Sequence, residues 1–197
     1  MGFGTCCRAS ASGEPLIVST LEFLSQGGRL IDTAQMYENH RDVATAIARS
    51  GIPRSELWIT SKVRTIDTSL TRASTIAEVD KVLAELGLEQ LDLLLLHHAK
   101  GNGAKERAAQ WQALLEVAKV GKARHVGVSN YDLAQLKALQ ACYRLCPRLP
   151  RARAQTHGHA RTLLLAGHHR RASRRQSARV PPMGRRVDAR DRAVVSA

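Results

Sequence analysis

The chain has 197 residues, of which 44% are hydrophobic, and it carries a formal net charge of +13. A chain of this size can bury a core without a disulfide scaffold. It has no uncharged apolar run near the roughly 20 residues that cross a membrane, and no basic segment followed by an apolar stretch at its N-terminus. This pattern excludes a spanning helix and a signal peptide. We therefore expect a cytoplasmic protein whose four cysteines are reduced thiols.

The charge is concentrated in the last quarter of the chain. Residues 144–197 hold 14 Arg, no Lys and two acidic residues, whereas residues 1–143 hold 16 basic and 15 acidic residues. The tail also contains no aromatic residue and only one leucine triplet, so it lacks the material for a core of its own. We predict a folded domain over residues 1–145 and a disordered, Arg-rich tail over residues 146–197.

Short apolar runs alternate with longer amphipathic segments along the first part. Each expected strand is bounded by polar or Gly residues, and each expected helix repeats its apolar residues at spacings of three and four. In chain order we expect a strand at 2–5, a helix at 16–25, strands at 30–33 and 57–60, a helix at 75–86, a strand at 91–96, a helix at 106–120, a strand at 125–129 and a helix at 132–145. These elements make about five βα units, and units of this kind build either an open doubly wound sheet or a (β/α)8 barrel.

Polar residues at the strand ends distinguish these two folds. An open nucleotide-binding sheet usually has a G-x-G-x-x-G loop after its first strand, and the Gly2–Gly4 pair lacks the third glycine. A barrel instead collects its chemistry from the C-terminal ends of several strands. Asp32, Lys62 and His97 each follow an expected strand. The sequence therefore favours an α/β fold of the (β/α)8 TIM-barrel type that is incomplete, with about five of its eight units.

These three residues and Tyr37 suit the reduction of a carbonyl group. A phenol with a pKa near ~10 is a poor proton donor at neutral pH. A lysine ammonium nearby stabilises the phenolate, and a carboxylate paired with the lysine fixes its position. A histidine can orient the substrate oxygen through a hydrogen bond. Since none of the four groups supplies electrons, this chemistry needs a bound hydride donor.

Five motifs resemble those of the aldo-keto reductases, in the family's order and spacing. They are Gly2–Thr5, Gly28–Tyr37, Ile59–Lys62, Leu91–His97 and Gly121–Asn130. The resemblance implies a barrel that binds NADPH at its C-terminal mouth and reduces aldehydes or ketones to alcohols.

Family positions also imply a role for each candidate residue. Tyr37 matches the proton donor, Asp32 and Lys62 match the pair that tunes it, and His97 matches the histidine that orients the substrate. Ser129 and Asn130 match residues that hold the nicotinamide carboxamide. Gln155 is a further candidate for the nicotinamide, because a glutamine and a histidine stand at the spacing of the family's next strand.

Other interpretations of single residues remain open. His98 competes with His97, although strand alternation points the two side chains in opposite directions. Ser129 and Asn130 also fit an ordinary helix N-terminus. We expect Trp58 and Trp111 to belong to the core. No metal site is predicted, because the four Cys and His residues at 142, 146, 157 and 159 fit no usual zinc spacing.

The resemblance ends after the fifth unit. An intact barrel needs about 250 residues and eight strands, so three strands are unaccounted for. The Arg-rich tail that stands in their place is typical of a reading-frame change, a mispredicted exon boundary or a truncation. Open edges of a partial barrel favour self-association. We expect little or no activity from this chain alone, on a small carbonyl substrate.

A binding function is the alternative. A net charge of +12 over residues 144–197 would attract nucleic acid or another anionic partner through phosphate contacts. The tail has no aromatic residues to stack bases, so we expect no specific nucleic-acid recognition. A third alternative is a catalytically inactive barrel fragment that pairs with another protein.

Overall fold

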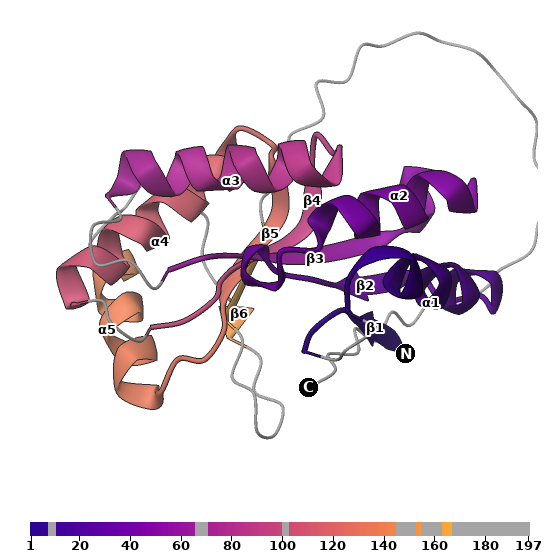
Figure 1. Ribbon diagram of the computed structural model, residues 1–197. Helices are drawn as coiled ribbons and strands as arrows, with labels where there is room; N and C mark the ends of the chain where they lie inside the picture. Colours follow the sequence, from indigo (N-terminus) through magenta and orange to yellow (C-terminus); the bar gives the residue numbers. More distant parts are fainter. Residues whose placement is uncertain (8–10, 66–70, 100–102, 145–152, 155–162, 167–197) are drawn as a thin grey trace, which may run out of the picture.

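The computed structural model describes residues 1–7, 11–65, 71–99, 103–144, 153–154 and 163–166 (Figure 1). The boundary predicted at residue 145 stays a prediction, because most of the tail lies outside the described residues. No helix in the described part is long and apolar enough to cross a membrane.

A parallel sheet forms the centre of the fold. Its strands are β1 (Gly2–Gly4), β2 (Leu30–Asp32), β3 (Trp58–Val63), β4 (Leu91–Leu96) and β5 (Ala123–Val128). They are neighbours in chain order, and each pairs in parallel with the next. All five predicted strands are therefore confirmed. Because the strands are parallel, their C-terminal ends meet at one edge of the sheet.

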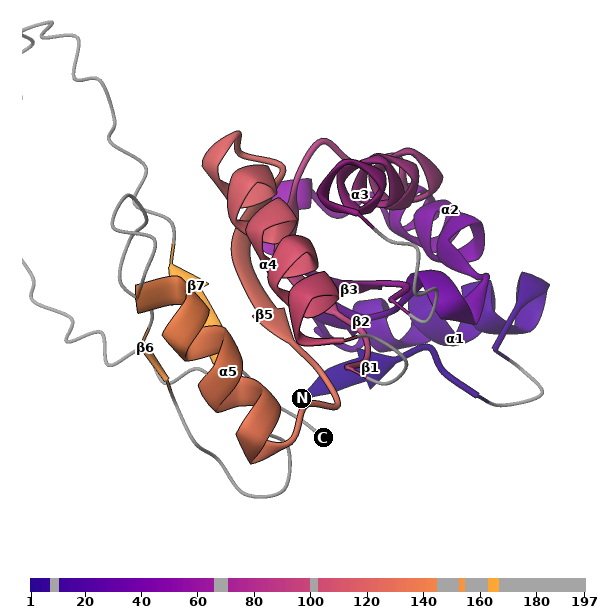
Figure 2. The same cartoon turned by 90° about the vertical axis from the view of Figure 1, so that its left-hand side faces the viewer.

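Helices connect successive strands and cover one side of the sheet (Figures 1 and 2). They are α1 (Gly13–Ser25), α2 (His40–Ser50), α3 (Arg72–Leu86), α4 (Ala104–Lys119) and α5 (Leu133–Arg144), with short 3-10 turns η1 (Gln35–Tyr37) and η2 (Arg54–Glu56). Thr71 begins α3 with a capping box, and Gly87 ends it with a φ of +63°. Helices that follow each other along the chain pack side by side. This βα arrangement confirms the predicted fold class.

The core lies between the sheet and the helices. Ile59, Val63 and Leu94 from the strands are fully buried there, and Trp111 from α4 is 1% exposed, as predicted. Trp58 does not belong to this core: it is 37% exposed and stacks on His125 with ring centroids 5.6 Å apart. Side chains alternate along a strand, so Trp58 faces the side opposite Ile59, away from the helices.

The two edges of the parallel sheet differ. The edge at β5 pairs antiparallel with β7 (Leu163–Ala166), which in turn pairs with β6 (Arg153–Ala154). These six tail residues depart from the expected wholly disordered tail and from the family's parallel sixth strand. At the other end β1 pairs only with β2 among the described strands. Among the described strands, the sheet therefore ends at β1, which is the edge that we call open.

Candidate active site

The strand ends place Asp32, Lys62 and His97 at one edge of the sheet. Asp32 is the last residue of β2, and its register partner on β3 is Thr60, two residues before Lys62. Lys62 in turn pairs with Leu95 on β4, two residues before His97. Residues two apart on a strand face the same side. The register thus aligns the lysine and the histidine on the concave side of the sheet.

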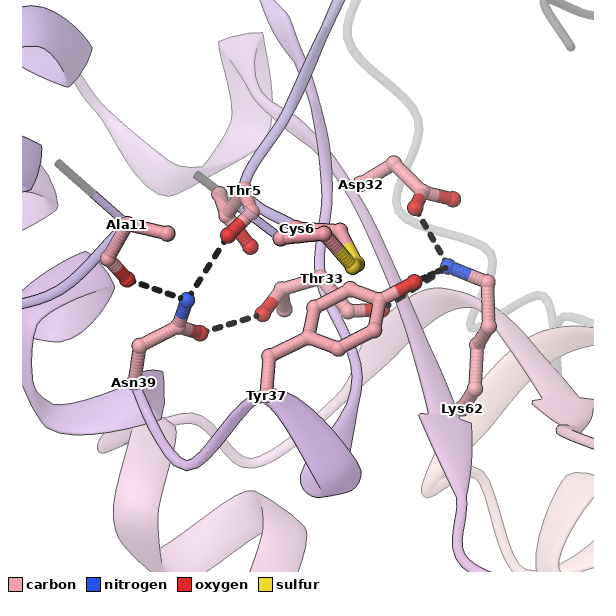
Figure 3. The surroundings of a disulfide bond; sticks show 9 residues. Thr5, Cys6, Ala11, Asp32, Thr33, Tyr37, Asn39 and Lys62 are labelled. Carbon is pink, nitrogen blue, oxygen red and sulfur yellow. Dashed lines mark hydrogen bonds and ion pairs between the residues drawn. A yellow bond between two sulfur atoms is a disulfide. The ribbon is translucent and has the colours of Figure 1, made fainter. Parts of the chain in front are cut away.

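Lys62 is at the centre of the polar contacts in the site. Its side chain is 9% exposed and forms an ion pair with Asp32 Oδ1 (Figure 3). Its Nζ also donates to the backbone oxygen of Thr33 at 3.2 Å and to the hydroxyl oxygen of Tyr37 at 3.4 Å. A buried ammonium needs such partners, since burial of an unpaired charge is very costly. The ion pair therefore fixes the ammonium within reach of the phenol.

Tyr37 reaches the site from η1, the turn that follows β2. Its backbone N–H donates to the oxygen of Ala34 at 3.0 Å, which closes the turn. The ring centroid lies 5.2 Å from Lys62 Nζ. His97 packs edge-on against the same ring, with centroids 5.5 Å apart. The structure therefore brings all four predicted residues together around the phenol.

His97 keeps unused hydrogen-bonding capacity. It is 6% exposed, and its Nδ1 is buried without a hydrogen-bond partner in the described part of the chain. His98 stacks on it with centroids 4.3 Å apart, and the backbone N–H of His98 donates to Thr65 Oγ1 at 2.9 Å. Of the two histidines, His97 is therefore the one that packs against Tyr37.

Ser129 and Asn130 follow β5 directly, at the same edge of the sheet. The Ser129 N–H donates to the oxygen of Leu96 at 2.9 Å, and Asn130 Nδ2 donates to the oxygen of His97, also at 2.9 Å. Asn130 has a φ of +57°, a left-handed conformation that asparagine tolerates better than most residues. Both predicted cofactor residues thus adjoin the candidate histidine. Gln155 lies outside the described residues.

Two polar residues support the site without having been identified from the sequence. Asn39 is buried, and its Nδ2 donates to the oxygens of Thr5 and Ala11 at 2.9 and 2.8 Å. His40 is also buried, and its ring nitrogens bond Glu85 Oε2 at 2.8 Å and Ser61 Oγ at 3.0 Å. Both anchor the loop around Tyr37, at the N-cap and the first residue of α2. No signal in the sequence distinguished them.

Cys6 and Cys7 follow β1 at this edge of the sheet. Asp32, Tyr37 and Lys62 lie in the surroundings of Cys6 (Figure 3). The expectation of reduced thiols stays a prediction.

The buried histidine gives the folded state a defined acid sensitivity. Burial, together with the charges of the nearby His98 and Lys62, lowers the pKa of His97 to about 4. The unfolded histidine has a pKa near ~6.5, so between these values the unfolded chain binds a proton that the folded chain does not. The free energy of unfolding should therefore fall as pH drops through this window, by at most about 3 kcal/mol.

Urea denaturation at several pH values between neutral and pH 4 measures this effect. His97→Gln should reduce the pH dependence but not abolish it, because burial also lowers the pKa of His40. An unchanged pH dependence in the variant would show that His97 is not the group responsible.

Comparisons with known proteins agree with this geometry. The aldo/keto reductase family pattern matches residues 10–186. Glyoxal reductase of Bacillus subtilis is 38% identical over 137 residues, which are 70% of this chain and 48% of that protein. Methylglyoxal reductase DkgB of Salmonella typhi is 37% identical over 127 residues, or 64% of this chain and 47% of that protein.

Solved structures of aldo-keto reductases are also similar to this chain. A Bombyx mori aldo-keto reductase in complex with NADP is 26% identical, has a TM-score of 0.63, and is matched over 72% of this chain and 50% of its own. The chain spans about half the length of the relatives it matches. The family pattern nevertheless covers most of its residues, and the chain belongs to the aldo/keto reductase family.

Proposed function

We propose that this site reduces the carbonyl group of a small aldehyde or ketone to an alcohol, with NADPH as the hydride donor. One observation carries the proposal: the buried Lys62 Nζ contacts both the Asp32 carboxylate and the Tyr37 hydroxyl, and His97 packs against that same phenol. An acid, a phenol, an amine and an imidazole at one edge of the sheet form a proton-donating set next to a hydrogen-bonding group.

The phenol of Tyr37 gives its proton to the carbonyl oxygen as that oxygen gains charge. The Lys62 ammonium, 3.4 Å from the hydroxyl oxygen, stabilises the phenolate that remains. Asp32 keeps the ammonium in place through its ion pair. His97 is neutral at physiological pH, because burial lowers its pKa to about 4, and a neutral imidazole can donate a hydrogen bond that orients the substrate oxygen.

Ser129 and Asn130 would hold the nicotinamide, and Gln155 is a third candidate. When bound, NADPH supplies the hydride that the four side chains cannot supply. Two observations suit a ligand at this place: His97 has a buried ring nitrogen without a partner in the described ranges, and Asn130 is hydrogen-bonded to the backbone of that histidine. The complex of the Bombyx mori relative with NADP supports the choice of cofactor.

The substrate class follows from the named relatives. Two of them are a methylglyoxal reductase and a glyoxal reductase, so we propose small, reactive aldehydes of this kind. Because the chain spans about half of each relative, we expect slow turnover by this chain alone. A misplacement of about 1 Å in bound reactants can cost a factor of 10², and half a barrel holds its ligands on fewer sides.

Consumption of NADPH in the presence of methylglyoxal tests the proposal. Lys62→Met should lower the rate of the full chain by a factor of about 10² or more, since the phenolate loses its only buried cation in the described site. Lys81→Met is the matched control, because the Lys81 side chain is 62% exposed on α3 and pairs with Glu78 at the surface. Equal losses in both variants, or none in either, would contradict the assigned role of Lys62.

Three further expectations stay predictions. We propose that copies of the chain associate through the open edge at β1, which sedimentation would detect.

A location in the cytoplasm is predicted from the sequence alone. Non-specific binding of the basic tail to nucleic acid would appear as salt-dependent retention that is lost when residues 146–197 are deleted.

A further inference from the structure

A serine, a histidine and a carboxylate lie in hydrogen-bonding order behind the candidate site, and the proposed reduction gives them no role. His40 Nε2 lies 3.0 Å from Ser61 Oγ, and His40 Nδ1 lies 2.8 Å from Glu85 Oε2. This is the order of a hydrolase triad. Ser61 is completely buried, however, so no substrate can reach its oxygen. The three groups therefore act on the fold around them and not as a nucleophile.

The serine belongs to the strand that carries the candidate ammonium. Ser61 directly precedes Lys62 on β3. Because side chains alternate along a strand, Ser61 faces the helices while Lys62 faces the concave side. The backbone of both residues is fixed by β4, through the register pairs of Ser61 with Leu94 and of Lys62 with Leu95. A hydrogen bond to the Ser61 hydroxyl is thus a bond to the frame that holds the ammonium.

The loop between β2 and α2 carries Tyr37 and is tied to β3 at both ends. At its start, the Thr33 N–H donates to the oxygen of Thr60 at 2.9 Å. At its end, His40 bonds Ser61, the next residue of the strand. The loop therefore forms an arch that starts and ends at adjacent residues of β3, with Tyr37 inside it.

Two other side chains hold this loop, but neither makes the same link. Asn39 bonds backbone oxygens of the loop between β1 and α1 (Figure 3). Gln35 Oε1 accepts from the Arg64 N–H at 2.9 Å, in an exposed position. The bond between His40 and Ser61 is buried on both sides, with exposures of 2% and 0%, so water cannot replace it. His40 is thus the buried side chain that fixes the far end of the loop to the strand.

Glu85 on α3 fixes the orientation of the ring. Its carboxylate accepts from the Nδ1–H of a neutral His40, which leaves the lone pair of Nε2 to accept from the Ser61 hydroxyl. The ring is neutral at physiological pH, because burial lowers its pKa by more than the hydrogen bond and the charge of Glu85 raise it. One tautomer thus satisfies both partners.

We propose that His40 is a positioning residue for the reduction, because its bond to Ser61 sets the separation between the Tyr37 hydroxyl and the Lys62 ammonium. This role rests on the proposed function. Tyr37 Oη and Lys62 Nζ are 3.4 Å apart, which is long for a hydrogen bond. A small outward movement of the loop would therefore separate them. His40 does not contact either group and acts through Ser61.

Two amide substitutions separate the two bonds of His40. The amide in His40→Asn lies near the position of Nδ1 and can still donate to Glu85, but it does not reach Ser61. The longer amide in His40→Gln lies near the position of Nε2 and can bond Ser61, but not Glu85. Ser61→Ala removes the same bond as His40→Asn with the loss of a single oxygen atom. It therefore also serves if His40→Asn does not fold.

Thr20→Val is the matched control for the loss of a buried hydroxyl. Thr20 is completely buried, and its Oγ1 donates to the oxygen of Leu16 within α1 at 2.8 Å. The substitution keeps the size of the side chain and removes a bond that does not reach β3. It should leave the separation of Tyr37 and Lys62 unchanged.

Carbon NMR of the full chain, with carbon-13 at the ζ-carbon of its three tyrosines, observes the phenol without NADPH. Tyr37→Phe assigns the Tyr37 signal. We expect this signal to move by more than its line width in His40→Asn and Ser61→Ala, because the ammonium lies at a different separation. It should keep its wild-type position in His40→Gln and Thr20→Val. A signal that stays in place in both His40→Asn and Ser61→Ala, or moves equally in His40→Gln, would overturn the proposal.

Kinetics give a second measurement. The kcat for methylglyoxal reduction should fall by a factor of about 10 to 10² in His40→Asn, as for a misplacement of up to about 1 Å, with KM and the Kd for NADPH unchanged. In His40→Gln it should stay near the wild-type value. A purely structural role would lower the urea midpoint and leave both kcat and the Tyr37 signal as they are, which would overturn the proposal.

The two measurements separate this proposal from the proposed function. A Tyr37 signal that moves as expected, with no NADPH-dependent turnover in the wild type, would support the positioning of the phenol and count against the reductase function. Turnover with equal kcat in the wild type and His40→Asn would support the reductase function and overturn the role of His40.

Discussion

Replacing Tyr37 with phenylalanine should lower the rate of NADPH-dependent methylglyoxal reduction by a factor of about 10² to 10⁴, the usual contribution of a positioned proton donor. The change removes one oxygen atom, which lies 3.4 Å from Lys62 Nζ. The ring and its edge-on contact with His97 remain, so the fold and the affinity for NADPH should be unchanged. Initial rates and cofactor binding, measured on the same preparation, separate the two effects.

Tyr131→Phe provides the matched control. It removes the same atom from a buried tyrosine whose hydroxyl has no partner in the described ranges. Loss of an unpaired buried hydroxyl is neutral or slightly stabilising, so the turnover rate should stay at the wild-type value. Equal rates in Tyr37→Phe and Tyr131→Phe would remove the phenol of Tyr37 from the mechanism.

The second large effect concerns stability at the opposite end of the strands. Asp92 on β4 is 1% exposed, and it forms ion pairs with Arg54 at 2.7 Å and Arg124 at 2.9 Å. Its Oδ2 also accepts from the backbone N–H of Ile59 at 2.9 Å. One carboxylate thus links β4 to the turn before β3, to β3 itself and to β5.

Asp92→Leu should lower the free energy of unfolding by about 3 kcal/mol. Loss of one partner of a buried pair typically costs 3–5 kcal/mol, and the lower end applies because Arg54 and Arg124 are 31% and 47% exposed and can recover water contacts. The buried N–H of Ile59 has no such access and is left without an acceptor. Urea denaturation measures the change.

Asp80→Leu is the control for this prediction. Asp80 pairs with Lys122 at the surface, where the two side chains are 50% and 36% exposed. An exposed pair contributes less than about 1 kcal/mol. If both variants shift the urea midpoint equally, the buried network around Asp92 does not stabilise the fold as the structure indicates.

Patterns of apolar residues predicted most of the sheet. The run at 91–96 coincides with β4, and every residue there except Leu93 is buried. The end of β3 was placed too early, because Ser61 and Lys62 are polar. These two residues are buried all the same, since His40 satisfies the serine and Asp32 pairs with the lysine. Such long-range partners are not visible in a local window of sequence.

Two errors have a similar physical origin. Helix α2 was not predicted, because its buried face uses only His40, Val43 and Ala46, which is too small an apolar set for the spacing rule. Trp58 was assigned to the core because it lies inside an apolar segment. In this chain the face opposite Ile59 is only partly covered.

The candidate site was more predictable than these details. Asp32, Lys62 and His97 stand at the ends of parallel strands, and that topology alone brings them to one edge of the sheet. Tyr37 needed the resemblance, since no periodicity distinguishes a turn tyrosine from any other. The support from Asn39 depends on a contact between the first and second loops. Sequence spacing does not encode that contact.

Transfer of label from the cofactor to the product tests the central claim most directly. The full chain is incubated with methylglyoxal and NADPH that carries deuterium at the transferable position, and the alcohol is analysed by mass spectrometry. We predict deuterium on the alcohol carbon with the wild type, and a loss of most of that label with Tyr37→Phe. Label above the protein-free control that is equal in wild type and variant would contradict the assignment of the four residues to carbonyl reduction.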